Sequence, residues 1–245
     1  MMLKNKNILV TGAGKGIGES SVKNLINNGA FVYALVKDKR DSKKFKKLNN
    51  LKIYNGNVLN EKLINRIIKD SLKNKKPINC LVNNAGIRLR KEFIKINNNE
   101  LRKVLEINFF SIFSILQIFS KFWIKKKIQG TVVNISSIVG KTGFKELSVY
   151  AASKGAVTSL TKSFAVEMAK YGIKANCISP GFTKTSFYSK FKKNKKLYNW
   201  TLSRIPMKRW GDPIEISNLI CFLLSENSNY INGEDINIDG GWLNS

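Results

Sequence analysis

The chain has 245 residues, 43% of them hydrophobic, which is enough for one large domain with a substantial buried core. It carries 43 Lys and Arg residues against 16 Asp and Glu, a formal net charge of +27, and no histidine. The lack of histidine excludes Ser-His-Asp triads, Cys-His pairs and HExxH zinc sites, so any proton transfer must use another side chain.

In chain order, short apolar and β-branched runs alternate with helical stretches. The predicted strands are 7–12, 31–36, 51–56, 78–84, 131–136, 173–179 and 235–240, and the predicted helices include 18–29, 60–74 and 152–172. This alternation indicates βαβ units, and therefore an α/β fold: a Rossmann-like, doubly wound parallel sheet of about seven strands with helices on both faces. We expect a single domain over residues 1–245, with ligands beyond the carboxyl ends of the strands.

The first predicted strand runs into TGAGKGIG, residues 11–18. Glycines let the backbone turn tightly and approach a pyrophosphate, and the following helix offers its N-terminal amides to the negative charge. A glycine-rich turn between a strand and a helix favours a nucleotide site.

The second strand ends in LVKDKR, residues 35–40. An acidic residue at this turn accepts hydrogen bonds from the ribose hydroxyls of NAD and would repel a 2′-phosphate. Lys37 at the turn and Lys15 in the glycine loop can together hold a 2′-phosphate, so the sequence favours NADP(H) over NAD(H). Asp38 is the residue that could reverse this preference.

The segment SVYAASKGA, residues 148–156, places Tyr150 four residues before Lys154. In a helix the two side chains lie on one face. The ordinary pKa of tyrosine, about 10, is too high for an efficient base near neutrality, and a cation one helical turn away lowers that pKa. The pair therefore predicts an acid-base group in a chain without histidine.

Six motifs follow one another over essentially the whole chain: TGxxxGxG at 11–18, NNAG at 83–86, Asn108, NISS at 134–137, YxxxK at 150–154 and PG at 180–181. As a set they resemble the short-chain dehydrogenase/reductase family. The resemblance implies an NAD(P)-dependent oxidoreductase that interconverts a ketone and a secondary alcohol by hydride transfer. A cofactor-binding protein without catalysis would not need Asn108, Ser137, Tyr150 and Lys154, and all four are present.

The resemblance also implies roles for single residues. Tyr150 would be the acid or base, Ser137 would bind the substrate oxygen, Lys154 would bind the nicotinamide ribose, and Asn108 would hold a water in a proton path behind Lys154. The implied cofactor-binding residues are Gly12, Lys15, Gly16, Ile17, Gly18, Lys37, Asn57, Asn84, Gly86, Tyr150, Lys154, Pro180, Gly181, Thr183 and Thr185. Asn57 departs from the family pattern, which usually has aspartate there, although its amide oxygen can still accept a bond from adenine.

Arg88 and Arg90, which follow the fourth strand, are candidate substrate residues together with Ser137 and Tyr150. The planar fork of arginine suits a carboxylate or a phosphate. Residues 183–207 are the predicted substrate lid. The candidate pocket aromatics are Phe182, Phe187, Tyr188 and Trp200.

Two substrate classes remain open. Residues 197–216 and the ending DGGWLNS resemble the sugar-acid branch of the family, including gluconate 5-dehydrogenases and keto-deoxygluconate oxidoreductases, so a keto-sugar acid or polyol is the leading prediction. RIPMKRWGDP, residues 204–213, also resembles the 3-oxoacyl-acyl-carrier-protein reductases. Basic runs at 124–127 and 190–196 would then be docking patches for acyl carrier protein. The resemblance also implies a homotetramer that uses the long helices and the C-terminal strand.

Other partners are not expected. The basic residues are spread along the chain without an RNP, helix-turn-helix or zinc-finger pattern, so a nucleic-acid-binding protein is only a remote alternative. Cys80, Cys177 and Cys221 form no CxxC motif, and no metal site is expected. The most apolar region, 107–123, is interrupted by polar residues and predicts a buried helix. These features favour a cytoplasmic protein without a membrane anchor.

Overall fold

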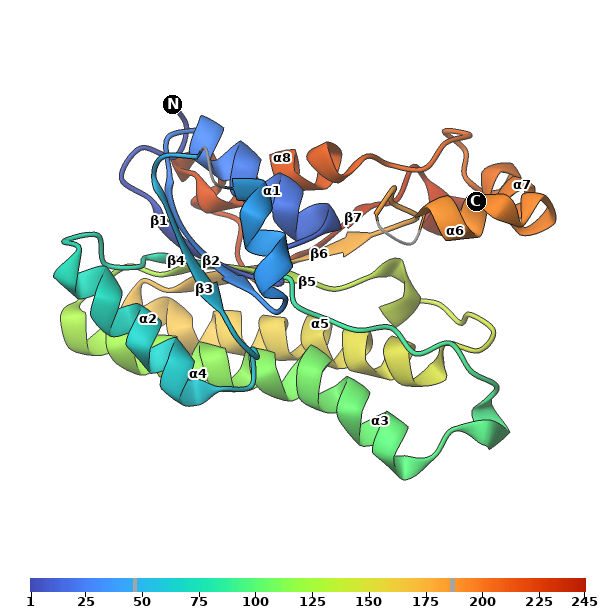
Figure 1. The fold of residues 1–245 in the computed structure, drawn as a ribbon, viewed down its shortest axis with the longest axis horizontal. Coiled ribbons are helices and arrows are strands. Elements are labelled where there is room, and N and C mark those ends of the chain that lie inside the picture. The colour runs from blue at the N-terminus through green and yellow to red at the C-terminus, as the bar shows by residue number, and fades with distance from the viewer. Residues whose placement is uncertain (46–47, 186–187) are drawn as a thin grey trace.

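The computed structural model describes residues 1–45, 48–185 and 188–245. Within the described residues, seven parallel strands form one sheet in the order β3-β2-β1-β4-β5-β6-β7 (Figure 1). The strands are β1 (Asn7–Thr11), β2 (Phe31–Val36), β3 (Leu51–Asn55), β4 (Cys80–Asn83), β5 (Thr131–Ile135), β6 (Lys174–Pro180) and β7 (Asp235–Ile238). The predicted doubly wound α/β fold is confirmed, with each strand within two residues of its expected bounds.

Helices cover both faces of the sheet (Figure 1). On one face lie α1 (Gly16–Asn27) and α8 (Pro213–Leu224), which pack against each other. On the other face lie α2 (Glu61–Lys73), α4 (Ser111–Lys126) and α5 (Ser148–Met168), with α3 (Asn98–Leu105) leading into α4. Because both faces are covered, the central strands are apolar along their whole length, as in Val32–Val36, rather than alternating.

Local sequence signals account for where helices begin. The side chain of Asn60 accepts a hydrogen bond from the Leu63 amide at 3.1 Å and starts α2. At α3, Asn97 and Glu100 form a reciprocal capping box. Such caps satisfy amides that have no partner inside the helix.

One helical run, Asn98–Lys126, is long and apolar enough to cross a membrane by length and composition. Its α4 part buries Ile112, Ile115, Leu116 and Phe119 in the cluster that also holds sheet residues of β1, β4 and β5. The indole of Trp123 donates a hydrogen bond of 2.8 Å to the Ile78 carbonyl. The run is therefore a core helix of the fold, as the sequence predicted for 107–123.

The strand order reverses between β1 and β4, since the chain moves outward through β2 and β3 before it returns to the other side of β1. At this switch point the loops at the carboxyl ends of neighbouring strands diverge and leave room for a ligand. The glycine-rich loop, NNAG, NISS and PG follow β1, β4, β5 and β6 and so gather at one edge of the sheet. Two short helices, α6 (Tyr188–Lys193) and α7 (Lys195–Arg204), lie beyond the same edge (Figure 1).

Candidate active site

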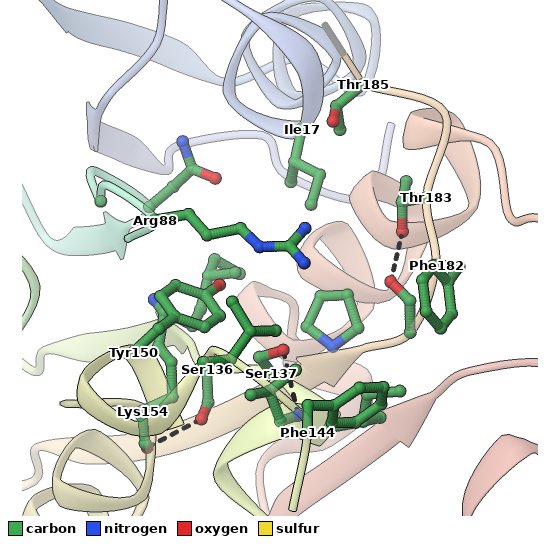
Figure 2. A pocket seen from close by; sticks show the side chains of 18 of the residues that line it. Ile17, Arg88, Ser136, Ser137, Phe144, Tyr150, Lys154, Phe182, Thr183 and Thr185 are labelled. Atoms are coloured by element: carbon green, nitrogen blue, oxygen red, sulfur yellow. Dashed lines mark hydrogen bonds between the residues drawn. The ribbon is translucent and has the colours of Figure 1, made fainter. Parts of the chain in front are cut away.

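A cavity of about 400 Å³ opens at the carboxyl ends of the strands. Figure 2 shows side chains from several loops converging on it. The lining residues are Ile17, Asn84, Gly86, Ile87, Arg88, Ile135, Ser136, Ser137, Ile138, Val139, Phe144, Leu147, Tyr150, Lys154, Pro180, Gly181, Phe182, Thr183, Thr185 and Trp210. Every motif noted in the sequence except Asn108 thus contributes a residue to the lining of one cavity.

The glycine loop after β1 has the geometry of a phosphate cradle. Gly12 and Gly16 have φ of +62° and +53°, which L side chains rarely adopt. A Cβ on Gly18 would collide with the Gly12 carbonyl oxygen, so the first turn of α1 can pack against the loop only with a glycine at this position. Lys15 occupies the N-cap of α1 and gives it no side-chain cap, which leaves the first amides of α1 available to an anion.

Asn84 ties the end of β4 to this loop. Its amide nitrogen donates to the carbonyls of Thr11 at 3.2 Å and Gly12 at 3.0 Å. The glycine loop also contacts the segment after β6, since a Cβ on Gly16 would lie 3.0 Å from Cβ of Thr185, and the Thr183 hydroxyl donates to the Gly181 carbonyl at 3.1 Å. The loop after β1 therefore contacts both the loop after β4 and the segment after β6, and all three carry residues predicted to hold a nicotinamide cofactor.

The residues predicted to bind the adenosine ribose and its 2′-phosphate, Lys15 and Lys37, do not line the cavity. Lys37 is exposed, and Nζ of Lys15 lies 3.8 Å from Asp41. Arg40 donates to Asp38 through Nη2 at 2.7 Å and Nε at 3.1 Å, and it holds the pKa of that carboxyl at about 2. Asp38 is thus ionised and already engaged by a cation.

Asn57 has a different local role from the one implied by the resemblance. Its side-chain oxygen accepts a hydrogen bond from the Leu59 amide at 3.1 Å, which stabilises the turn after β3. The residue is exposed and does not line the cavity. The structure gives it no link to the other cofactor residues.

Helix α5 presents Tyr150 and Lys154 on its cavity side, one turn apart, as the spacing predicted. Lys154 is only 4% exposed, and its Nζ donates to the Ile135 carbonyl at 2.7 Å while lying 5.8 Å from the centre of the Tyr150 ring. Ser137 begins the short turn after β5 and hydrogen-bonds to Tyr150. The Ser137 hydroxyl from this loop therefore lies beside the phenol and the ammonium group that one turn of α5 brings together.

The electrostatics of the tyrosine differ from the sequence prediction. Burial raises the pKa of Tyr150 above its ordinary value, and the positive charge of Arg88 and the hydrogen bond from Ser137 oppose that rise. We expected Lys154 to lower this pKa, but burial outweighs the lowering influences and the net direction is upward. Lys154 itself is desolvated, which lowers its pKa to about 8.

Asn108 lies fully buried in a π-helical turn, Glu106–Phe110, between α3 and α4. Its oxygen accepts from the Ile87 amide at 2.8 Å, and its nitrogen donates to the Ile87 carbonyl at 2.9 Å and to the Ser153 hydroxyl at 3.0 Å. Such π-turns are frequent at functional sites. Asn108 therefore fastens the loop after β4 to helix α5.

The two arginines of the loop after β4, Arg88 and Arg90, lie in different environments. Arg88 reaches across the cavity between Ile17 and Thr185 on one side and Tyr150 and Ser137 on the other (Figure 2). Arg90 instead bonds Glu146 at 2.7 Å on the exposed surface and does not line the cavity. The electrostatic action of Arg88 on Tyr150 was not predicted from the sequence.

Aromatic side chains close the far side of the cavity. Phe182 lines it, with Trp210 at 5.0 Å between ring centres, and Phe144 lines it as well. Tyr188 and Trp200 pack on Trp210 and Trp242 rather than on the cavity. Phe187 lies outside the described residues. Sequence reasoning missed Phe144 and Trp210, whose loops only the tertiary fold brings beside Phe182.

Among the residues that the structure describes, no group of three His, Cys, Asp or Glu side chains could hold a metal ion. The two basic runs also differ in position. Residues 124–127 end α4 just before β5 begins, at the amino edge of the sheet and away from the cavity. The run 190–196 lies in α6 and α7, where Phe191 packs on Phe182 at 6.1 Å and so flanks the site.

Comparison with known proteins identifies the family. A family model described as "Enoyl-(Acyl carrier protein) reductase" matches residues 12–243. The 3-oxoacyl-[acyl-carrier-protein] reductase FabG of Thermotoga maritima is 35% identical over 246 residues, which cover 98% of this chain and 99% of that protein. The chain belongs to the short-chain dehydrogenase/reductase family.

Other members of the short-chain dehydrogenase/reductase family have about the same sequence identity to this chain as that FabG. The 5-keto-D-gluconate 5-reductase of Escherichia coli K12 is 34% identical, with 98% of this chain and 96% of that protein covered. The structures of 4-hydroxyisoleucine dehydrogenase with NADH and of ElxO with NADP match with TM-scores of 0.92 and 0.90, at 31% and 32% identity, over 98% of this chain and 99% of each of theirs. This short-chain dehydrogenase/reductase is therefore an oxidoreductase, and its fold is shared with structures that bind nicotinamide cofactors.

Proposed function

We propose that this short-chain dehydrogenase/reductase interconverts a ketone and a secondary alcohol with NADP(H), and that its substrate is a keto-sugar acid or a related polyol. One observation carries the reaction type: Ser137, Tyr150 and Lys154 line the same cavity as the glycine loop, and Asn108 fastens two of its walls together. The residues of the cradle fit a dinucleotide, since its glycines leave no room for side chains and its helix start has no side-chain cap.

A bound nicotinamide cofactor would supply or accept the hydride. The protein side chains stabilise the charge on the carbonyl oxygen of the substrate and transfer the proton to it. As negative charge develops on that oxygen, the Ser137 hydroxyl donates a hydrogen bond to it and the Tyr150 hydroxyl donates the proton. Lys154, held by the Ile135 carbonyl, stabilises the resulting phenolate. In the oxidative direction Tyr150 accepts the proton from the alcohol.

The preference for NADP(H) is supported by charge. Lys15 and Lys37 flank the loop where an adenosine ribose would lie, and both are largely exposed. Asp38, the residue that could have favoured NAD(H), is paired with Arg40 through both carboxylate oxygens. A 2′-phosphate would therefore meet a lysine pair and a neutralised carboxylate, which makes its binding favourable.

The sugar-acid substrate is supported by the similarity to the 5-keto-D-gluconate 5-reductase of Escherichia coli K12 and by the polar and cationic side chains that line the cavity. Reduction of a 3-oxoacyl thioester carried by acyl carrier protein is the second candidate. It is favoured by the similarity to FabG and by the basic run 190–196, which flanks the cavity in the lid helices. The run 124–127 supports it less, because it lies at the opposite edge of the sheet.

We further propose that residues 1–245 form one domain in which 183–207 is the substrate lid, and that the protein acts in the cytoplasm as a homotetramer. Exposed apolar side chains on the long helices support association: Phe113 on α4 is 47% exposed and Val166 on α5 is 79% exposed. Light scattering coupled to gel filtration would measure the assembly. A monomeric mass at micromolar concentration would contradict the tetramer.

The function is tested by following NADPH and NADH absorbance with three substrates: 5-keto-D-gluconate, a neutral keto-polyol and a 3-oxoacyl thioester. We expect turnover with NADPH, fastest with 5-keto-D-gluconate. Faster reduction of the thioester would assign the second candidate. Failure to reduce any of the three, by protein shown to bind NADPH, would contradict both.

A further inference from the structure

We propose that Arg88 is a specificity-determining residue that binds the carboxylate of an anionic keto substrate beside Tyr150. The inference rests on the proposed ketone chemistry of this site and narrows its substrate to anions. Arg88 reaches into the cavity toward the space in front of Tyr150 and Ser137 (Figure 2). Its planar fork can bind both oxygens of a carboxylate.

The loop that carries Arg88 is fastened on both sides. Before it, Ile87 exchanges two hydrogen bonds with Asn108, of 2.8 and 2.9 Å. After it, Arg90 bonds the Glu146 carboxylate at 2.7 Å, and the Lys91 amide donates to the Glu146 carbonyl at 2.9 Å. These bonds fix the backbone on both sides of Arg88 before any ligand binds. The entropy cost of ordering the loop around a ligand is therefore lower.

The charge of the cavity points to an anion. Among the described residues that line it, the charged ones are Arg88 and Lys154, and none is acidic. Lys154 is buried and bonded to the Ile135 carbonyl, whereas Arg88 remains accessible to solvent and can meet an entering substrate. A site walled by cations of this kind raises the local concentration of anions and disfavours cationic substrates.

Binding an anion at Arg88 would also prepare the acid. The groups that act on the Tyr150 hydroxyl are Arg88 from the β4–α3 loop and Ser137 from the loop after β5, while the Lys154 ammonium group, one turn along α5, lies 5.8 Å from the centre of the Tyr150 ring. A substrate carboxylate would offset the positive charge of Arg88 and so remove one influence that favours the phenolate. Tyr150 would then keep the proton that reduction of the ketone requires.

The test pairs each acid with its neutral counterpart. We would measure kcat/KM with NADPH for acetoacetate and acetoacetamide, and for 5-keto-D-gluconate and its carboxamide, using native protein, Arg88→Gln and the control Arg102→Gln. Arg102 lies exposed on α3, outside the cavity. Native protein is expected to prefer the acid of each pair. Arg88→Gln should lose about 100-fold for the acids and stay within about threefold for the amides, because only the acids lose a charge partner.

A second readout separates a binding role from a structural one. With the neutral amides, the alkaline limb of the kcat/KM profile should lie at higher pH in Arg88→Gln than in native protein, since the cation that favours the phenolate is gone. Equal losses for acid and amide, or native protein that prefers the amides, would overturn the inference while leaving ketone reduction intact. Absence of turnover on every ketone would overturn the proposed function and this inference together.

Discussion

Burial of the Lys154 ammonium group should make the free energy of unfolding depend on pH by a predictable amount. Burial lowers its pKa from 10.5 to about 8 in the folded protein. Between these two pH values the unfolded chain binds more protons than the folded chain, so stability rises with pH. The cost of burying the charged Lys154 is absent above pH 10.5 and grows as the pH falls to about 8. A difference of about 2.5 pKa units corresponds to roughly 3 kcal/mol.

Lys154→Met removes this titration, because methionine carries no charge. We expect the free energy of unfolding of native protein, relative to Lys154→Met, to rise by roughly 3 kcal/mol between pH 8 and pH 10.5. Urea unfolding followed by tryptophan fluorescence at fixed protein concentration would measure it. Lys162→Met, at an exposed position on the same helix, is the control and should show no such rise. A difference between native and Lys154→Met that stays constant across this range would refute the assignment of a desolvated lysine.

Three further substitutions test the cofactor cradle and its supports. Gly18→Ala places a methyl group against the Gly12 carbonyl, so NADPH binding measured by fluorescence should be lost and unfolding should become easier by about 1–3 kcal/mol; native-like affinity would contradict the cradle. Lys37→Glu should raise the KM for NADPH about tenfold and leave that for NADH unchanged, whereas equal effects would argue against a 2′-phosphate site. Asn108→Ala leaves both backbone groups of Ile87 without their partner and should cost about 2–4 kcal/mol in urea unfolding, with a smaller loss indicating that the loop can rearrange.

Much of the fold could be predicted from local patterns. The strand β2 was expected at its observed bounds because its apolar, β-branched run is closed on both sides by turn residues. The pairing of Tyr150 with Lys154 followed from helical periodicity alone, since one turn of α5 separates them. Both predictions needed only residues that are neighbours in sequence.

Other parts of the site depend on contacts that the sequence does not encode locally. Arg88 and Arg90 are indistinguishable by type, and their fates differ because Glu146, far along the chain, meets Arg90 at the surface. The electrostatics of Tyr150 likewise depend on how deeply the fold buries the phenol, which reversed the expected direction of its pKa. Burial and long-range ion pairs are tertiary properties, so spacing and composition could not supply them.

We propose that Tyr150 is the proton donor for ketone reduction in this cavity. The most direct measurement compares kcat for NADPH-dependent reduction of 5-keto-D-gluconate and of acetoacetamide by native protein and by Tyr150→Phe, with NADPH affinity measured in parallel. We predict a loss of at least about 100-fold in kcat on whichever ketone native protein reduces, with NADPH affinity unchanged, because the phenyl ring keeps the packing and lacks only the hydroxyl group that carries the proton. Turnover by Tyr150→Phe within threefold of native protein would contradict the assignment of Tyr150 as the proton donor.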